Sequence, residues 1–298
     1  MKIIKQHIVT TTPDKVRLID YALDIFSDFI LTRSMMKKSI KKGLIEIDGE
    51  KARGNEWIVG GMEISLLENE ENTPEPFEMK LDVIYEDEHL AVIVKPAGIV
   101  VSGNMYRTIV NAVQYNIAKS KLDDALPWPR PIHRLDMQTS GLLIIAKSQL
   151  ASVELGKQLE NKTLKKRYRA ILVGDVSDRI EFKSEIEGHK SHSELVKVKT
   201  INSIKSGKLS LVDLFPHTGR THQLRIHTSE NGTPILGDKL YGDIENTKLH
   251  KGLFLSAVEI TFSHPETKEV INLKIPQPSK FDSLLEREER MWEKKQLG

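Results

Sequence analysis

Residues 68–78, ENEENTPEPFE, form the composition break that most constrains how this chain can fold. The stretch is acidic, contains Pro74 and Pro76, and has almost no apolar residues, which is typical of an exposed linker between domains. A chain of 298 residues is long enough for one small and one medium domain. We therefore expect four parts: a small domain over residues 1–67, a linker over 68–79, a larger domain over 80–282 and a C-terminal surface helix over 283–298.

Several protein classes are excluded by composition. Cysteine is absent, which rules out disulfides, thiolate nucleophiles and Cys-ligated metal sites. No apolar run reaches the roughly 18 residues of a transmembrane helix, and the N-terminus lacks the features of a secretory signal. With 39% hydrophobic and 29% charged residues, the chain can bury an ordinary core. We expect a cytoplasmic protein that does not enter membranes.

The segment before the linker combines helices with a hairpin. Residues 16–45 have helical apolar spacing, with one face carrying Leu18, Ala22, Leu23 and Phe26. The following GLIEIDGEKA alternates as a strand and contains Asp48-Gly49, a strong hairpin signal. WIVGGMEISLL, residues 57–67, then predicts a strand, a Gly-Gly turn and a second strand. This order favours a small α/β domain.

After the linker, strands and helices alternate irregularly. LDVIYEDEHLAVIVK predicts two strands around an acidic turn, and residues 108–118 have helical apolar spacing. GLLIIAKS is a continuous apolar strand, after which Ser148 is expected to cap a helix that ends near Asn161. KKRYRAILVG alternates as a strand with Tyr168 on its apolar face. The pattern predicts an α+β fold with a mixed, largely antiparallel central sheet, flanking helices and an active-site cleft.

Positive charge is concentrated in two clusters, although the net charge is only +2. The first cluster, over residues 33–53, includes Arg33, Lys37 and Lys41, and the second, over 157–169, includes Lys166. Such clusters can neutralise phosphates, but they can equally be solvated helix faces. Because each lies beside a more specific motif, we interpret them as RNA-binding residues.

Known nucleotide, hydride-transfer and zinc-protease motifs are missing: the chain has no complete Walker A sequence, no GxGxxG, no GxSxG and no HExxH. His217, His222 and His227 lie five residues apart. Steps of five turn by about 140° on a helix and alternate faces on a strand, so these rings do not converge on a metal. We expect hydrogen-bonding or RNA-contacting roles for them, and no metal or cofactor.

The most informative segment is PIHRLDMQTSGLLIIAKS, residues 131–148, where His133-Arg134-Leu135-Asp136 directly precedes a buried strand. An Asp in this position is either a turn or capping residue or a carboxylate at the lip of a cleft. The adjacent Arg134 favours an ionised Asp136, which can serve as a nucleophile or a base. Residue chemistry alone leaves both interpretations open.

HRLDMQTSGLLIIAK resembles the signature of the RluA family of RNA pseudouridine synthases, whose catalytic Asp corresponds to Asp136. Further segments resemble family motifs in the same order: YEDEHLAVIVKPAGIVV, KKRYRAILVG with an active-site Tyr at Tyr168, HTGRTHQLRIH with Arg225 as partner of the catalytic Asp, GDKLYG, and LFLSAVEITFSHP. The resemblance covers about residues 80–280. VVSGN, residues 100–104, departs from the family pattern, which puts the choice of target in doubt.

This resemblance implies an isomerase that needs no cofactor and flips its target uridine out of the RNA stack. Arg134 would fill the space of the flipped base, Tyr168 would stack on the uracil, and Arg225 would orient Asp136. Residues expected to contact RNA, besides Arg134, are Arg33, Lys37, Lys41, Lys166, Arg220 and His222. Whether Asp136 adds to the ring or attacks or deprotonates the sugar stays open.

Residues 1–67 resemble the S-four RNA-binding domain. The matching positions are Arg17-Leu18, Thr32-Arg33-Ser34, Ile40, Lys42-Gly43, Ile45, Ile47-Asp48-Gly49 and Gly60-Gly61, whereas Met62 replaces the usual acidic residue. The combination of the two domains resembles the RluC and RluD branch, which implies large-subunit ribosomal RNA as the partner, with transfer RNA as another target. We expect a monomer.

Two other functions remain as alternatives. The same scaffold could be a non-catalytic RNA-binding or ribosome-assembly factor, although binding alone does not require Asp136, Tyr168 and Arg225 together. A hydrolase could use Ser140 or Ser102 with His133, but the sequence shows no strained serine elbow.

Overall fold

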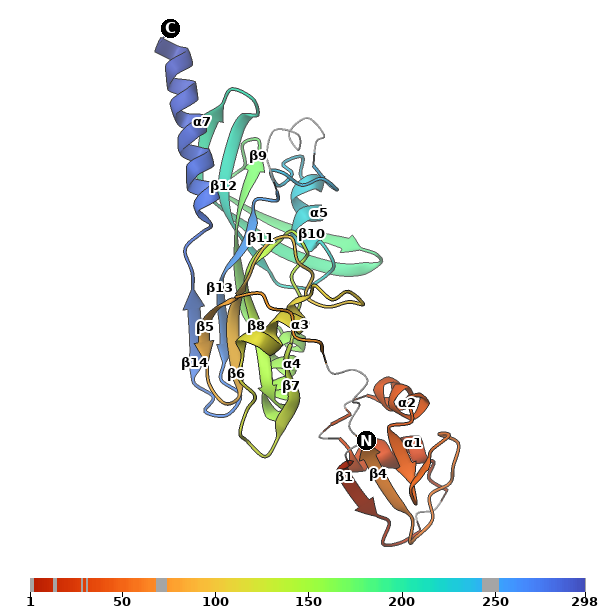
Figure 1. The fold of residues 1–298 in the computed structure, drawn as a ribbon. Coiled ribbons are helices and arrows are strands. Elements are labelled where there is room, and N and C mark those ends of the chain that lie inside the picture. Colours follow the sequence, from red (N-terminus) through yellow and green to blue (C-terminus); the bar gives the residue numbers. More distant parts are fainter. Residues whose placement is uncertain are drawn as a thin grey trace. The chain divides into compact units, whose positions relative to one another are not determined.

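The computed structural model describes residues 3–12, 15–27, 29–30, 32–67, 74–242 and 252–297. The chain divides into two compact units, Met1–Pro74 and Glu75–Gly298, called here the N-terminal unit and the larger unit (Figure 1). Within the described ranges, no helix is both long and apolar enough to cross a membrane.

The N-terminal unit packs two helices on a four-stranded antiparallel sheet with strand order β1-β4-β2-β3. Its strands are β1 (Ile3–Ile8), β2 (Ile45–Ile47), β3 (Glu50–Lys51) and β4 (Glu63–Leu67). Helices α1 (Leu18–Ile25) and α2 (Arg33–Lys41) share a core with the sheet. The region predicted as helical, residues 16–45, thus contains two helices, and the side chain of Thr32 caps the second.

Asp48 and Gly49 form the predicted hairpin turn between β2 and β3, and both have positive φ angles, of 53° and 81°. This conformation matches the turn that Asp-Gly favours. One expectation for this unit is wrong: Trp57 makes an isolated bridge with Arg17 instead of starting a strand. Helix α1 contains no basic residue, so the basic character of the helices belongs to α2.

The larger unit is built on a ten-stranded sheet, with order β10-β11-β12-β9-β13-β8-β6-β5, β14 beside β13 and β7 beside β8 (Figure 1). The strands are β5 (Asp82–Glu86), β6 (Leu90–Lys95), β7 (Ala125–Pro131), β8 (Ser140–Ser148), β9 (Lys165–Val173), β10 (Arg179–Ile186), β11 (His189–Ser203), β12 (Gly207–Pro216), β13 (Leu255–Ser263) and β14 (Val270–Lys274). Among the described strands, β8 and β13 pair in parallel and the other pairs are antiparallel. The predicted α+β class with a mixed, largely antiparallel sheet is confirmed.

Helices cover both faces of this sheet, which explains why the centre of β8, residues 142–146, is continuously apolar. Alternate residues of a strand point to opposite faces: Leu143 packs in the same core as α3 (Ile109–Asn116), whereas Leu142 and Ile144 pack with α4 (Gln149–Glu160). The hydroxyl of Ser148 accepts from the backbone N–H of Ala151 and caps α4, as predicted. Helix α5 (Gln223–Glu230) adds Leu224 to the core of α3.

Both ends of the larger unit pack against its core to a greater extent than the sequence indicates. Helix α7 (Ser279–Leu297) begins four residues before the predicted 283, and Phe281 and Leu285 pack in a core with Phe254. Its first half therefore belongs to the core and not only to the surface. Residues 68–73 of the expected linker lie outside the described residues, whereas Phe77 packs against the core and donates its N–H to Asn111.

Candidate active site

Asp136 lies in the loop between β7 and β8, four residues before β8 begins. Leu135 is buried in the core beside α3, and the backbone carbonyl of Asp136 accepts from the N–H of Thr139 at 3.0 Å. The backbone of Asp136 thus forms a turn, while its side chain stays 19% exposed and lines a cavity. The two roles between which the sequence could not decide coexist in one residue.

Lys95, at the end of β6, fixes this loop through hydrogen bonds to its backbone. Its side chain is fully buried, and its ammonium donates to the carbonyl oxygens of Pro96, Met137 and Thr139 at 2.9, 3.2 and 2.8 Å. Burial lowers the pKa of Lys95 to about 8, an effect opposed by the nearby charge of Asp136. Because two of the carbonyls, those of Met137 and Thr139, lie one and three residues after Asp136, this lysine ties the Asp136 loop to the sheet.

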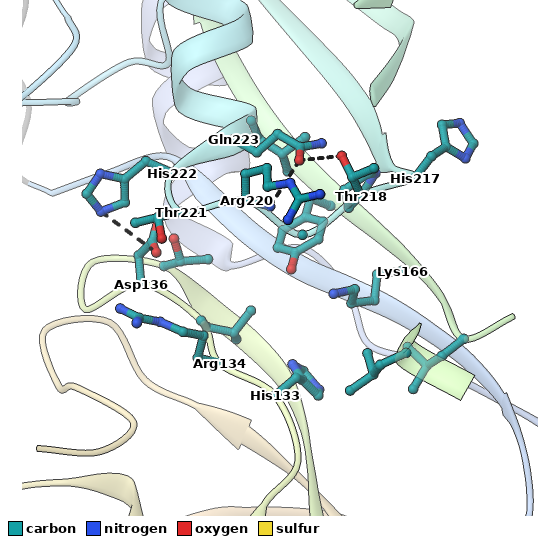
Figure 2. Close-up of a pocket in the computed structure, with 18 of the residues that line it drawn as sticks. His133, Arg134, Asp136, Lys166, His217, Thr218, Arg220, Thr221, His222 and Gln223 are labelled. Atoms are coloured by element: carbon teal, nitrogen blue, oxygen red, sulfur yellow. Dashed lines mark hydrogen bonds and ion pairs between the residues drawn. The ribbon is translucent and has the colours of Figure 1, made fainter. Parts of the chain in front are cut away.

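Two groups of the α5 region face the Asp136 carboxylate. The Nη1 atom of Arg225 lies 3.7 Å from Oδ2. Nε2 of His222 lies 3.8 Å from Oδ1, a contact drawn as a dashed line in Figure 2. The shorter contacts of Arg225 go elsewhere: Nε and Nη2 donate to the two carboxylate oxygens of Asp238 at 2.7 and 2.8 Å. The structure therefore brings Arg225 to Asp136, but Asp238 is its main partner.

The cavity beside Asp136 has a volume of about 510 Å³ and is lined by residues from three distant segments and by Leu255. They include Asp136, Tyr168, Lys166, Arg220, His222 and Arg225. Tyr168 reaches the cavity from β9 and is 7% exposed. Burial, together with the charge of Asp136, raises its pKa, so the phenol stays neutral. The volume lies within the range of small-ligand pockets.

Most charged groups around the cavity are cationic. Its lining includes two carboxylates, those of Asp136 and Glu160, and the cationic side chains of Lys166, Arg134, Arg220, Lys162 and Lys165. In Figure 2, Arg134 and Asp136 lie at one end of the pocket and Lys166 at the other. Burial lowers the pKa of Lys166. A concave site of this charge attracts polyanions.

Three expected RNA contacts lie in the other unit. Arg33, Lys37 and Lys41 are all exposed on α2, and Arg33 is ion-paired with Asp20. Lys37 and Lys41 form no ion pair within the described part of the chain. These residues form the basic face of α2.

The alternative serine hydrolase finds no support in the geometry. The Nε2 atom of His133 accepts from the backbone N–H of Ile144 at 3.3 Å, and burial lowers the pKa of His133 to about 3. Ser140 instead donates to Ser256. Among the described residues, no hydrogen bond joins His133 to Ser140 or Ser102, so no serine nucleophile is activated by this imidazole.

The three evenly spaced histidines have separate environments. His217 stacks on His192 with ring centroids 4.3 Å apart, His222 faces Asp136, and Nε2 of His227 hydrogen-bonds to Ser191 at 2.7 Å. No group of three metal-ligating side chains occurs in the residues that the structure describes.

Sequence reasoning missed Lys95, Asp238 and Tyr241. Lys95 was visible as the polar end of an apolar strand, and the other two lie within GDKLYG, between glycines that favour a turn. Their partners come from other segments: Lys95 bonds to Thr139, 44 residues away, and Nδ1 of His222 lies 3.0 Å from the hydroxyl of Tyr241. Composition and periodicity carry no information about such pairs.

Comparison with known proteins identifies the same part of the chain. The sequence model of a family described as RNA pseudouridylate synthase matches residues 89–230. A protein of Aquifex aeolicus named as an uncharacterized RNA pseudouridine synthase is 31% identical, covering 91% of this chain and 93% of that protein. Ribosomal large subunit pseudouridine synthase D of Neisseria meningitidis serogroup B is 31% identical, covering 85% of this chain and 74% of that protein.

A solved structure has the same fold over about two thirds of this chain. Human RNA pseudouridylate synthase domain containing 1 superposes with a TM-score of 0.57 at 25% identity, covering 68% of this chain and 86% of that one. Identity above 30% over nine tenths of the chain, together with the family match, decides the classification. This chain belongs to the RluA family of RNA pseudouridine synthases, the isomerases that convert uridine to pseudouridine in RNA.

Proposed function

We propose that this pseudouridine synthase uses Asp136 as its catalytic carboxylate and modifies a uridine in large-subunit ribosomal RNA. The observation that carries the proposal is the position of Asp136. Its carboxylate is partly exposed in a cavity of about 510 Å³, with Arg225 and His222 at 3.7 and 3.8 Å. A carboxylate beside a guanidinium and an imidazole at the edge of a cavity is suited to attack or proton abstraction.

The reaction breaks the bond between N1 of uracil and C1′ of ribose and forms a bond between C5 and C1′. C5 loses its proton and N1 gains one, so atoms and electrons balance without an oxidant or a co-substrate. Asp136 can begin the process by adding to the ring, by attacking C1′ or by removing a proton from the sugar. In each route a negative charge on Asp136 is used, and Arg225 keeps the carboxylate oriented.

The target nucleotide has to leave the RNA stack, because the sugar–base bond is inaccessible inside a helix. The cavity volume is sufficient for one base. Tyr168, a neutral and mostly buried aromatic ring on its wall, is suited to stack on the uracil. Arg134 is exposed at the entrance and lines the same cavity, where it would occupy the space of the flipped base.

The basic face of α2 is the proposed docking surface for RNA outside the target site. Exposed Lys37 and Lys41 supply sequence-independent affinity for phosphates. The choice of large-subunit ribosomal RNA rests on relatives such as the Neisseria meningitidis protein, whose name specifies the ribosomal large subunit. The N-terminal unit would then act as the S-four-like module that brings this RNA to the larger unit.

The decisive experiment incubates purified protein with unmodified ribosomal RNA and with transfer RNA, and maps pseudouridine by carbodiimide-stop sequencing. Wild-type protein should produce discrete stops in the large-subunit RNA, and Asp136→Asn should produce none. Asp178→Asn is the matched control, because Asp178 is 94% exposed and does not line the cavity.

Stops in transfer RNA alone would contradict the proposed substrate but keep the catalytic role of Asp136. Stops that persist in Asp136→Asn would remove Asp136 from the mechanism. If no substrate is modified while RNA still binds, the non-catalytic binding factor takes the place of this proposal.

A further inference from the structure

Asp238 is a deeply buried charged group whose partner, Arg225, faces Asp136. Its side chain is 0% exposed and accepts four hydrogen bonds, two from Arg225 and one each from the backbone N–H groups of Leu240 and Tyr241, at 2.9 and 3.1 Å. Burial alone would raise the pKa of Asp238, but these hydrogen bonds hold it below its usual value. The carboxylate is therefore charged and fixed in place.

Two glycines hold the turn that carries Asp238. At Gly237, where φ is 77°, an added Cβ would lie 2.1 Å from the carbonyl oxygen of Gly252. At Gly242 it would lie 2.4 Å from the backbone oxygen of Asp238. Neither contact could be relieved by moving a side chain, because both involve backbone atoms. Residues 237–242, called here the Asp238 turn, therefore tolerate no side chain at either of these two positions.

The Asp238 turn reaches both groups that face Asp136. Asp238 accepts hydrogen bonds from Nε and Nη2 of Arg225. The remaining nitrogen of the planar guanidinium, Nη1, therefore faces Asp136. The hydroxyl of Tyr241 lies 3.0 Å from Nδ1 of His222, which leaves Nε2 facing the other carboxylate oxygen. The Tyr241 ring also lies 5.1 Å from the Arg225 guanidinium.

His222 has a further reason to need this support. Its φ is 55°, in the left-handed region that is unfavourable for a residue with a side chain. Strained residues persist where surrounding contacts hold them, and they are concentrated at functional sites. The bond to Tyr241 is such a contact.

From this arrangement we propose that Asp238 is a positioning residue of the active site: it fixes the Arg225 guanidinium so that Nη1 stays on Asp136, and Tyr241 of the same turn does this for His222. The inference rests on the proposed catalytic role of Asp136. The competing explanation is that the buried pair of Asp238 and Arg225 contributes stability alone.

The two explanations differ in the catalytic rate of the folded enzyme. In Asp238→Asn, the single-turnover rate constant for pseudouridine formation should fall about 100-fold, because misplacing a reacting group by about 1 Å has an effect of that size. The dissociation constant for RNA should stay within twofold of wild type, since Asp238 does not touch the cavity. The rate is normalised to the folded fraction measured by circular dichroism.

Glu288→Gln is the matched control. Glu288 is likewise a buried carboxylate, 1% exposed, and it accepts from Ser203 on β11, far along the chain from the Asp136 loop. This variant should lose stability and keep its rate constant per folded molecule. If Asp238→Asn behaves in the same way as Glu288→Gln, the positioning role is overturned.

If Asp238→Asn does not fold, a second variant tests whether the orientation of the Arg225 guanidinium matters for the rate. Arg225→Lys keeps a cation beside Asp238, but a single ammonium cannot form the two-point contact and also face Asp136. We expect a folded protein with a rate loss of at least tenfold. A wild-type rate in Arg225→Lys would overturn the proposal, because the guanidinium orientation would then be irrelevant.

A double variant tests whether Asp238 acts through Arg225. Arg225→Met and Arg225→Met with Asp238→Asn should have the same rate constant, because the group that Asp238 positions is already gone. A further tenfold loss in the double variant would contradict this route. Inactive wild-type protein would instead contradict the proposed function itself, so the two failures are distinguishable.

Discussion

The Asp136 pocket and the basic face of α2 both present cations, but they hold them in different ways. In the pocket region, Lys95 is fully buried and donates hydrogen bonds to three backbone carbonyls. The side chain of Arg225 is 9% exposed and is paired with Asp238. On α2, Lys37 and Lys41 are exposed and have no ion pair within the described residues. Fixed cations position a reacting group, whereas mobile exposed cations supply affinity.

This difference has a physical basis. A buried charge requires partners, because desolvation is costly, and those partners determine its orientation. An exposed lysine keeps its hydration and rotamer freedom and interacts with a phosphate through charge alone. Substitutions in the pocket should therefore change the catalytic rate or the stability, and substitutions on α2 should change RNA affinity and its salt dependence.

The largest effect is expected at Asp136. Asp136→Asn keeps the shape of the side chain and removes its charge, so the rate of tritium release from RNA labelled at C5 of uridine should fall at least about 10⁴-fold, as for other catalytic nucleophiles. RNA affinity measured by filter binding should stay within about threefold. A parallel loss of affinity and rate would mean that the pocket also carries docking energy, which would break the comparison.

Lys95 should have the next largest effect, on stability as a function of pH. Its pKa is about 8 in the folded protein and about 10.4 in an unfolded chain. Between these values the unfolded state binds the additional proton, so the free energy of unfolding should rise with pH, by about 3 kcal/mol in total. Below pH 8 both states are protonated and this gain is absent.

Lys95→Met removes this titration and serves as the comparison. Denaturant titrations of both proteins between pH 7.5 and 10 should show the difference in unfolding free energy widening with pH in favour of wild type. Tyr168, whose pKa is raised, titrates at higher pH in both proteins and cancels in the difference. Parallel curves would show that the Lys95 ammonium is not desolvated and that the Asp136 loop is held in another way.

The sequence was sufficient for the elements that depend on local patterns. The apolar run of β8, the cap at Ser148 and the turn at Asp48-Gly49 each follow from residues within a few positions of one another. Helices were predicted over residues 16–45, but the boundary between α1 and α2 was not located, because apolar spacing marks helix faces and not helix ends. The core packing of α7 was missed because charged residues dominate its composition, whereas its apolar residues Phe281, Leu284 and Leu285 pack in the core.

For the candidate site, the sequence indicated which residues approach one another but not how they are held. Motif resemblance selected Asp136, Tyr168 and Arg225, which the structure places around one cavity. It implied a direct pair between Arg225 and Asp136, whereas the two shortest bonds of Arg225 are to Asp238. A guanidinium can divide its donors between two carboxylates, and only tertiary geometry determines the division.

The smallest effect is expected on α2, where Lys37→Gln should weaken RNA binding about fivefold at 0.15 M salt and reduce the slope of log affinity against log salt by about 1. The single-turnover rate constant at saturating RNA should be unchanged, because Lys37 orients no reacting group. Filter binding at several salt concentrations measures the slope.

Arg33→Gln is an informative control on the same helix. Because the Arg33 guanidinium is already paired with Asp20, fewer counterions are released when RNA approaches it, and the slope should change by less than for Lys37→Gln. Equal changes would show that RNA displaces Asp20 from Arg33, which would make the paired cation part of the docking face. An unchanged slope in both variants, with RNA affinity intact, would remove α2 from the docking surface and leave the pocket as the source of affinity, since its cations, Lys166 among them, are the other group positioned to meet phosphates.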